Sequence, residues 1–239
     1  MENLPRSIRT VFFDVGSTLI RPCPSMGEIY RRTLEPLGLT APAREYERLF
    51  GTTWDELGGR IGRGADRFHA MPGGEMGYWA AYVGSVLDQL GSDADVESAT
   101  LHLHDAFSAR SAWEVFPDVN ETLSALRGRG CQLGVISNWD SRLPVLLDSL
   151  GLGRFFGTVV FSSGAGAEKP SPLIFQEALR RAGARAEESV HVGDDLEADY
   201  AAAEAVGITG VLVDRDGSAP STVRRVGDLS ELLVLLEES

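Results

Sequence analysis

Residues 8–19 read IRTVFFDVGSTL, a short apolar run of β-branched and aromatic residues that ends at an aspartate and a turn of small residues. A run of this kind is typical of a strand buried on both faces of a parallel sheet. Four later runs have the same character: 132–137, 158–161, 190–193 and 209–213. Helical patterns separate these runs, and the alternation predicts an α/β fold whose parallel sheet is covered by helices on both faces.

Start and stop signals place helices between the later strands. Asp118 followed by Glu121 predicts a capping box. Ser171 followed by Pro172 predicts the start of another helix. A third helix is expected over about 196–206, because this alanine-rich segment is followed by a glycine.

Residues 22–112 break the alternation. Their apolar residues recur at helical spacing, without a convincing strand, in four segments: Glu28–Leu37, Ala43–Leu57, Gly77–Leu90 and Val96–Phe107. We therefore expect an all-helical domain at 22–112, inserted into a core domain made of residues 1–21 and 113–239. The two ends of an inserted domain have to lie close together.

The composition excludes several classes of protein. The 35 acidic residues outnumber the 22 basic ones, so the chain lacks the basic stripe with which proteins bind nucleic acid. No apolar stretch reaches the roughly 18 residues that a spanning helix needs, and the start, MENLPRSIRT, lacks the apolar segment of a signal peptide. Cys23 and Cys131 show neither thiolate-zinc nor disulfide-framework spacing. We expect a soluble cytoplasmic protein that binds neither nucleic acid nor a membrane.

Polar side chains follow four of the predicted strands: Asp14, Ser137 with Asn138, Lys169, and Asp194 with Asp195. Ligands of an open parallel sheet bind outside the carboxyl ends of the strands, where the strand order reverses. If the first strand is central, all four groups converge on one crevice. One polar group at a strand end is ordinary, but four at successive strand ends indicate a functional site.

These residue types suit phosphoryl transfer. Asp14 repels a phosphate dianion by about 4 kcal/mol per pair of unit charges at ~4 Å and an effective dielectric constant near 20, and Asp194 adds to this repulsion. A hard divalent cation between the carboxylates removes the obstacle, and Mg²⁺ prefers such oxygen ligands. Lys169, the only lysine, is a point charge for a phosphate oxygen, while Ser137 and Thr18 can donate hydrogen bonds to the others. The set predicts covalent transfer through an aspartyl phosphate.

The polar groups form a series of four motifs: DVGSTL at 14–19, ISN at 136–138, KP at 169–170, and GDD at 193–195 with Asp199. The series resembles that of haloacid dehalogenase-superfamily hydrolases across about 1–20 and 113–239. The resemblance implies a Rossmann-like sheet of five parallel strands in the order 3-2-1-4-5, with the Asp14 strand central, and a helical cap domain at the insertion. The stretches VISNWDSRL and KPSPLIFQEALRRAG are most similar to the subgroup of haloacid dehalogenase-like hydrolase domain-containing protein 3.

The resemblance implies a metal site at five matching positions. Asp14 would be the nucleophile and would bind Mg²⁺ together with Asp194 and the backbone carbonyl of Gly16. Asp195 and Asp199 would orient these ligands, and either could bind the metal through a water molecule.

Four further positions would hold a small anionic substrate. The resemblance implies that Ser137 and Lys169 hold the transferring group, with Thr18 and Asn138 in support. The expected substrate is a small phosphorylated metabolite. The sequence gives no indication of an oligomeric state.

One position departs from the family's pattern. The phosphatases of the family carry a second aspartate two residues after the nucleophile, which protonates the leaving oxygen and later activates water, whereas this chain has Gly16. General acid–base catalysis contributes roughly 100- to 10,000-fold to the reaction rate. Its loss would therefore severely slow the hydrolysis of ordinary phosphate esters, and it would matter less for acyl phosphates.

Three interpretations of Gly16 stay open. The chain could be a Mg²⁺-dependent phosphatase that works without the usual acid. It could be a 2-haloacid dehalogenase-type hydrolase, a branch that needs neither the second aspartate nor a metal. It could also be a catalytically impaired member that binds a ligand or partner. The acidic pair Asp194-Asp195 favours the first, because a metal-free site would be expected to avoid uncompensated charge.

Overall fold

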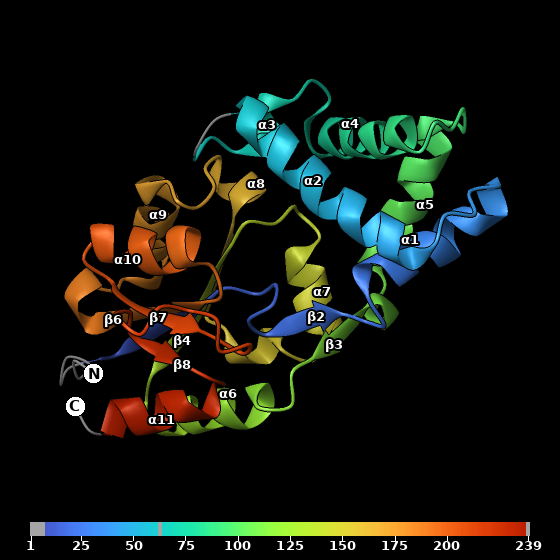
Figure 1. Ribbon diagram of the computed structural model, residues 1–239. Coiled ribbons are helices and arrows are strands. Elements are labelled where there is room, and N and C mark those ends of the chain that lie inside the picture. The colour runs from blue at the N-terminus through green and yellow to red at the C-terminus, as the bar shows by residue number, and fades with distance from the viewer. Residues whose placement is uncertain (1–7, 62–63, 238–239) are drawn as a thin grey trace. The chain divides into compact units, whose positions relative to one another are not determined.

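The computed structural model describes residues 8–61 and 64–237. The chain forms two compact units (Figure 1). The core unit comprises the residues up to 20 and those from 115 onward, and the inserted unit comprises residues 21–114. The core domain expected from the sequence begins at residue 1, and its residues 1–7 lie outside the described part of the chain.

The core unit contains a six-stranded sheet in which all neighbouring strands are parallel, with the order β5-β4-β1-β6-β7-β8. Its strands are β1 (Thr10–Phe13), β4 (Gln132–Ser137), β5 (Thr158–Phe161), β6 (Ser189–Gly193), β7 (Thr209–Val213) and β8 (Arg225–Val226). The first five follow the expected order 3-2-1-4-5, so the predicted fold class is confirmed. The sixth strand was missed, because a two-residue strand carries no detectable hydrophobic period.

Helices cover both faces of this sheet, with α9 and α10 on one side and α6 and α11 on the other (Figure 1). The helices of the core unit are α6 (Val119–Gly128), α7 (Leu143–Ser149), α8 (Ser162–Ala165), α9 (Pro172–Ala182), α10 (Ala202–Ala205) and α11 (Ser230–Glu237). Short 3₁₀ turns occur at Gly153–Phe155 and Ala186–Glu188. On the α9 side, Phe175 packs with Phe12 and Ile136 of the central strands in one buried cluster. The sheet is therefore buried on both faces, as its continuous apolar runs require.

One helix signal read from the sequence is wrong, and one expected helix is present but starts in an unexpected form. Asp118 precedes α6, but it makes no side-chain cap and instead accepts hydrogen bonds from Arg215 and from the backbone of Leu229. The helix expected over 196–206 begins as a π-helical segment, η5 (Leu196–Ala201), before α10. The predicted start at Ser171 is confirmed, since its hydroxyl accepts from the backbone N–H of Leu173.

The inserted unit is helical and has its own core. Its helices are α1 (Met26–Leu34), α2 (Ala43–Ile61), α3 (Arg67–Ala70), α4 (Gly74–Gln89) and α5 (Val96–Ser108), with 3₁₀ turns at Glu35–Leu37 and Arg110–Ala112. Four tyrosines form the centre of the buried cluster: Tyr30, Tyr46, Tyr78 and Tyr82. The four expected helical segments are present, and among the described α-helices of this unit the sequence patterns missed the short α3.

A second, two-stranded sheet lies where the chain passes from one unit to the other. Its strands are β2 (Ile20–Pro22) and β3 (Trp113–Val115). Arg21 and Glu114, in the inserted unit, form an ion pair across it at 2.8 Å. This pairing brings the two ends of the insertion together, and strands of three residues are too short for the sequence to have revealed them.

No helix within the described residues is both long and apolar enough to cross a membrane.

Candidate active site

Asp14 lies at the carboxyl end of β1, the strand with β4 on one side and β6 on the other. Its backbone N–H donates to the carbonyl of Val192 at 2.9 Å, which continues the β1–β6 ladder by one residue. Ser137 ends β4, and Asp194 directly follows β6. Parallel neighbours end at the same edge of a sheet, so the predicted strand-end groups are brought together at the reversal of strand order.

Lys169 lies between two carboxylates in the interior of the core unit. Its Nζ donates to Oδ1 of Asp14 at 2.6 Å and to Oδ1 of Asp199 at 2.5 Å. The hydroxyl of Ser137 donates to the same Asp14 oxygen at 2.8 Å. Lys169 is only 4% exposed and Asp14 7%. Charge-assisted hydrogen bonds of this kind are short and strong because one or both partners are ionised.

Asn138 fixes the backbone on which Lys169 is carried. Its side-chain Nδ2 donates to the carbonyl of Lys169 at 3.0 Å, and its Oδ1 accepts from the Lys169 backbone N–H at 2.7 Å. Sequence reasoning gave Asn138 a supporting role toward substrate. The geometry commits both ends of its amide to the lysine loop, which favours a role in positioning Lys169.

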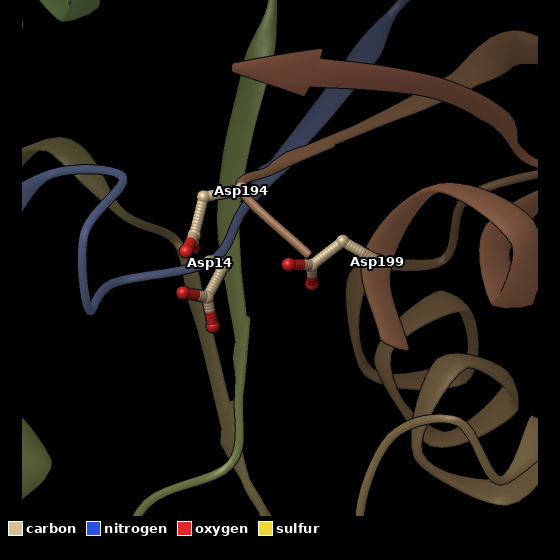
Figure 2. Close-up of side chains that lie close together, drawn as sticks. All are labelled: Asp14, Asp194 and Asp199. Carbon is tan, nitrogen blue, oxygen red and sulfur yellow. The ribbon is translucent and has the colours of Figure 1, made fainter. Parts of the chain in front are cut away.

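Three carboxyl groups come together beside this ion pair. Figure 2 shows Asp14, Asp194 and Asp199 turned toward one another, from the end of β1, the end of β6 and η5. One oxygen from each lies within 4.8 Å of the others. Thr18 donates from Oγ1 to Oδ1 of Asp194 at 3.1 Å. Clustered carboxylate oxygens are the donor set that Mg²⁺ prefers, so the residues present fit this cation.

The clustered charges change the protonation equilibria. Asp194 is exposed as a residue, but the surrounding protein withdraws its carboxylate from water, and with the Asp14 and Asp199 charges this raises the pKa of Asp194 to about 7. Burial also raises the pKa of Asp14. Burial alone would lower the pKa of Lys169, yet Asp14 and Asp199 raise it above its usual value, so the lysine stays charged. A cation beside the two aspartates would relieve the same repulsion.

Asp195 and Asp199 take different places, although both were expected to orient the ligands. The Asp195 carboxylate caps η5, where its Oδ1 accepts from the backbone N–H groups of Glu197 and Ala198 at 2.8 and 2.7 Å. Asp199 points into the site and is 2% exposed. Burial tends to raise the pKa of Asp199, but Lys169 and other donors outweigh this effect and hold the pKa well below its usual value.

Gly16 has room for a side chain. Its backbone φ angle is not positive. Among the described residues, a Cβ placed there would meet only Cζ3 of Trp139, at an ordinary contact distance of 3.6 Å. The unusual backbone lies one residue later, at Ser17, whose φ is 57°. Neither backbone strain nor lack of space therefore requires glycine at position 16. Sequence reasoning did not associate Trp139 with this position.

The sequence matches the model of the haloacid dehalogenase-like hydrolase family over residues 8–207. This chain belongs to that family. Haloacid dehalogenase-like hydrolase domain-containing protein 3 of Danio rerio is 33% identical over 210 residues, which cover 87% of this chain and 86% of the relative. Its counterpart in Homo sapiens is also 33% identical, over 86% of this chain and 82% of that protein. The predicted family and subgroup resemblance is confirmed, and the chain is a hydrolase.

The relatives and solved structures that are named for an activity include both a phosphatase and a 2-haloacid dehalogenase. Glyceraldehyde 3-phosphate phosphatase of Methanopyrus kandleri is 37% identical over 54% of this chain and 57% of its own length. Among solved structures, the 2-haloacid dehalogenase of Pseudomonas syringae is 26% identical, with a TM-score of 0.67, over 97% of this chain and 99% of that chain. The family hydrolase YfnB of Bacillus subtilis has a TM-score of 0.79 at 19% identity, over 96% of this chain and 99% of that chain, which shows the shared fold.

Proposed function

We propose that this hydrolase is a Mg²⁺-dependent phosphatase that forms a covalent phosphoryl intermediate on Asp14. The supporting observation is that Asp14 meets Lys169 and Ser137 on one side and two further carboxylates within 4.8 Å. Such a site offers a nucleophile, cationic and hydroxyl donors for an anion, and oxygen ligands for a cation. The expected substrate is a small phosphorylated metabolite.

The two oxygens of Asp14 have different tasks in this proposal. Oδ1 accepts from both Lys169 and Ser137, whereas Oδ2 accepts no side-chain hydrogen bond from the described residues. Oδ2 would attack phosphorus while Oδ1 stays held. The ammonium group of Lys169 uses two of its three N–H donors within the protein, so the third can bind a phosphoryl oxygen.

The cation would be held by Asp14, Asp194 and, as the family resemblance implies, the carbonyl of Gly16. When bound, Mg²⁺ neutralises charge on the carboxylates and on the phosphoryl group. Thr18 orients Asp194 through its hydroxyl hydrogen bond. Asp199 balances the charge of Lys169, which keeps the lysine between the two carboxylates.

Gly16 determines which phosphates the site can cleave quickly. With no carboxyl group at this position, the departing oxygen receives no proton from the loop that follows the nucleophile. When the P–O bond breaks, an acyl phosphate releases a carboxylate and an aryl phosphate a phenolate. Both are stabilised anions, so this first step does not depend on that proton. Alkyl phosphate esters need the proton, so their hydrolysis should be slower than with a proton donor at this position, by a factor within the roughly 100- to 10,000-fold range that general acid–base catalysis supplies.

A second candidate is a dehalogenase-type hydrolase. It is favoured by Gly16 together with the 26% identity to the 2-haloacid dehalogenase of Pseudomonas syringae over nearly the whole chain. In that chemistry Asp14 attacks carbon, and the halide leaves without a proton. The clustered carboxylates argue against it, because uncompensated charge at a metal-free site is costly.

The test is a matrix of purified protein against acetyl phosphate, p-nitrophenyl phosphate and 2-haloacids, each with Mg²⁺ or EDTA. Mg²⁺-dependent phosphate release that Asp14→Asn abolishes is the expected result. Asp216→Asn, which removes an exposed aspartate of the last turn, is the matched control and should change nothing. Halide release in EDTA would establish the second candidate. No turnover in any mixture, with activity appearing in Gly16→Asp, would identify a catalytically impaired member.

A further inference from the structure

The carboxylate of Asp199 is held by three donors from different parts of the core unit. Oδ1 accepts from Nζ of Lys169 and from Nε2 of His191, at 2.5 and 2.8 Å. Oδ2 accepts from the backbone N–H of Asp195 at 3.1 Å. Lys169 and Asp195 belong to the family's motifs, but His191 lies outside them, in the middle of β6.

A buried histidine at position 191 lowers the stability of the folded protein relative to an apolar residue. It is fully buried, and its Nδ1 has no hydrogen-bond partner within the described residues. Burial lowers its pKa, which favours the neutral ring. Because Nε2 lies 2.8 Å from a carboxylate oxygen, which can only accept, we assign the ring proton to Nε2. An unpaired buried polar atom is destabilising, because it has lost its hydrogen bonds to water without gaining others. The flanking residues are valines, and an apolar side chain would serve packing at this position without that cost.

The same strand also provides the space that Asp199 occupies. A Cβ added to Gly193 would clash with Cγ of Asp199, so the carboxyl group can approach β6 only because residue 193 has no side chain. His191 and Gly193 are two residues apart and therefore point to the same face of the strand. His191 provides a hydrogen-bond donor and Gly193 provides the space, so β6 both accommodates and binds the Asp199 carboxylate.

We propose that His191 is a positioning residue of the active site, which fixes Asp199 so that Asp199 holds the Lys169 ammonium group against Asp14. A lysine side chain is flexible, so the place of its Nζ depends on its partners. Without the imidazole, Oδ1 of Asp199 keeps only Lys169 as a donor. The carboxylate can then turn, and the ammonium group follows it. The effect on turnover rests on the proposed function, whereas the effect on Lys169 does not.

Variants at position 191 distinguish the effect of side-chain length from the effect of a hydrogen-bond donor. Gln can place an amide N–H near the position of the imidazole Nε2, Asn is too short to do so, and Leu has no donor. His191→Asn and His191→Leu should each lower kcat by about 10- to 100-fold, the usual cost of losing a residue that orients a site group, with KM for acetyl phosphate nearly unchanged. His191→Gln should recover most of the loss. If His191→Leu does not fold, the Asn and Gln pair still gives the comparison.

A readout independent of activity comes from the lysine itself. Because Lys169 is the only lysine, protein grown with labelled lysine gives a single side-chain ammonium signal in NMR. That signal should be sharp and slow to exchange in wild type and His191→Gln, and shifted or broadened in His191→Asn and His191→Leu. The shift should persist even if wild type hydrolyses no phosphate, in which case the proposed function fails and the positioning role stands.

The matched control is Val190→Ala, which removes buried volume from the same strand, at a position that faces the opposite side of the strand from His191 and Gly193. It should lower the melting temperature and leave both the Lys169 signal and kcat unchanged. The proposal is overturned if the Asn and Leu variants only destabilise the protein, as Val190→Ala does. It is also overturned if they lose turnover while the lysine signal stays as in wild type.

Discussion

Lys169 in the core unit and Arg67 in the inserted unit are both buried cations, but they differ in the groups that they contact. In the core unit, Lys169 and Asp199 are 4% and 2% exposed and meet each other as charges. In the inserted unit, the buried Arg67 lies with its guanidinium 3.8 Å from the centroid of the Trp54 ring, within a cluster of aromatic residues. Buried charges that face other charges cost desolvation, so they are poor packing elements. Under the proposed function, the Lys169–Asp199 pair serves the reaction, whereas the contact of Arg67 with Trp54 and the surrounding aromatic cluster serves the stability of the inserted unit.

The largest effect is expected from Lys169→Met. It leaves Asp14 and Asp199 buried together without their cation, so unfolding free energy should fall by about 3–5 kcal/mol. Turnover of acetyl phosphate should fall by about 100- to 1000-fold, as for loss of one preorganised donor. Denaturant titration and steady-state kinetics measure the two effects. Equal turnover in the variant and wild type would mean that the charged interior has no role in the reaction.

In the inserted unit, Tyr82→Ala should affect stability alone. Tyr82 is fully buried, and its hydroxyl donates to the carbonyl of Phe50 at 2.6 Å. Removing such an aromatic side chain costs about 3–5 kcal/mol. Chemical denaturation gives the loss, and kcat for acetyl phosphate, corrected for the folded fraction, should match wild type. A large fall in that corrected kcat would show that a buried aromatic residue of the inserted unit affects turnover as well as stability.

Gly16→Asp adds the carboxyl group that the family's phosphatases carry. The contact at Trp139 is an ordinary 3.6 Å from the added Cβ, so the variant should fold. Hydrolysis of alkyl phosphate esters should rise by about 100-fold, the lower end of what general acid–base catalysis supplies, with a smaller rise for acetyl phosphate. Gly16→Ala is the matched control and should give no increase. If Gly16→Asp gives none either, the missing proton donor is not what limits these substrates.

The pH dependence of Mg²⁺ binding tests the carboxylate cluster. Because the pKa of Asp194 is raised to about 7, a proton occupies this carboxyl group below that pH and competes with the cation. Apparent Mg²⁺ affinity should therefore fall by about 10-fold per unit as pH decreases below 7, and should level off above it. Isothermal titration calorimetry across this range measures the slope. A flat profile between pH 5 and 7 would show that Asp194 is not in competition with Mg²⁺.

The smallest effect is expected from Ser17→Gly. Ser17 is exposed, has φ of 57°, and makes no side-chain hydrogen bond within the described part of the chain. Glycine adopts this left-handed conformation without steric cost, so the variant should gain about 0.5–1 kcal/mol of unfolding free energy. Urea denaturation is sensitive enough to detect this gain. A loss of stability would show that the serine hydroxyl contributes to the loop.

The strand ends could be read from the sequence because a parallel sheet brings its carboxyl ends to one edge. Asp14 and Asp194 directly follow buried strands and Ser137 ends one, so their convergence needed only the strand order. Lys169 was placed from its position after the third strand, and its ion pair follows from the charges near it. These features depend on local sequence and on one rule of topology.

Other features depend on contacts that no local pattern encodes. Asp118 has the sequence of a helix cap, yet Arg215, 97 residues later, binds its carboxylate instead. The helix at about 196–206 was expected, but its π-helical start at 196–201 was not, because an alanine-rich sequence does not distinguish a π-helix from an α-helix. The one available signal for His191 was a histidine in an otherwise apolar strand run, SVHVG, which is a weak indication without the position of Asp199.

Acid quenching of a reaction with acetyl phosphate and Mg²⁺, followed by peptide mass spectrometry, tests the central claim most directly. The account predicts one phosphoryl group on the peptide that contains Asp14, formed only with Mg²⁺ and absent in Asp14→Asn. Full turnover without this adduct in wild type, or the same adduct in Asp14→Asn, would contradict the claim that Asp14 is the nucleophile.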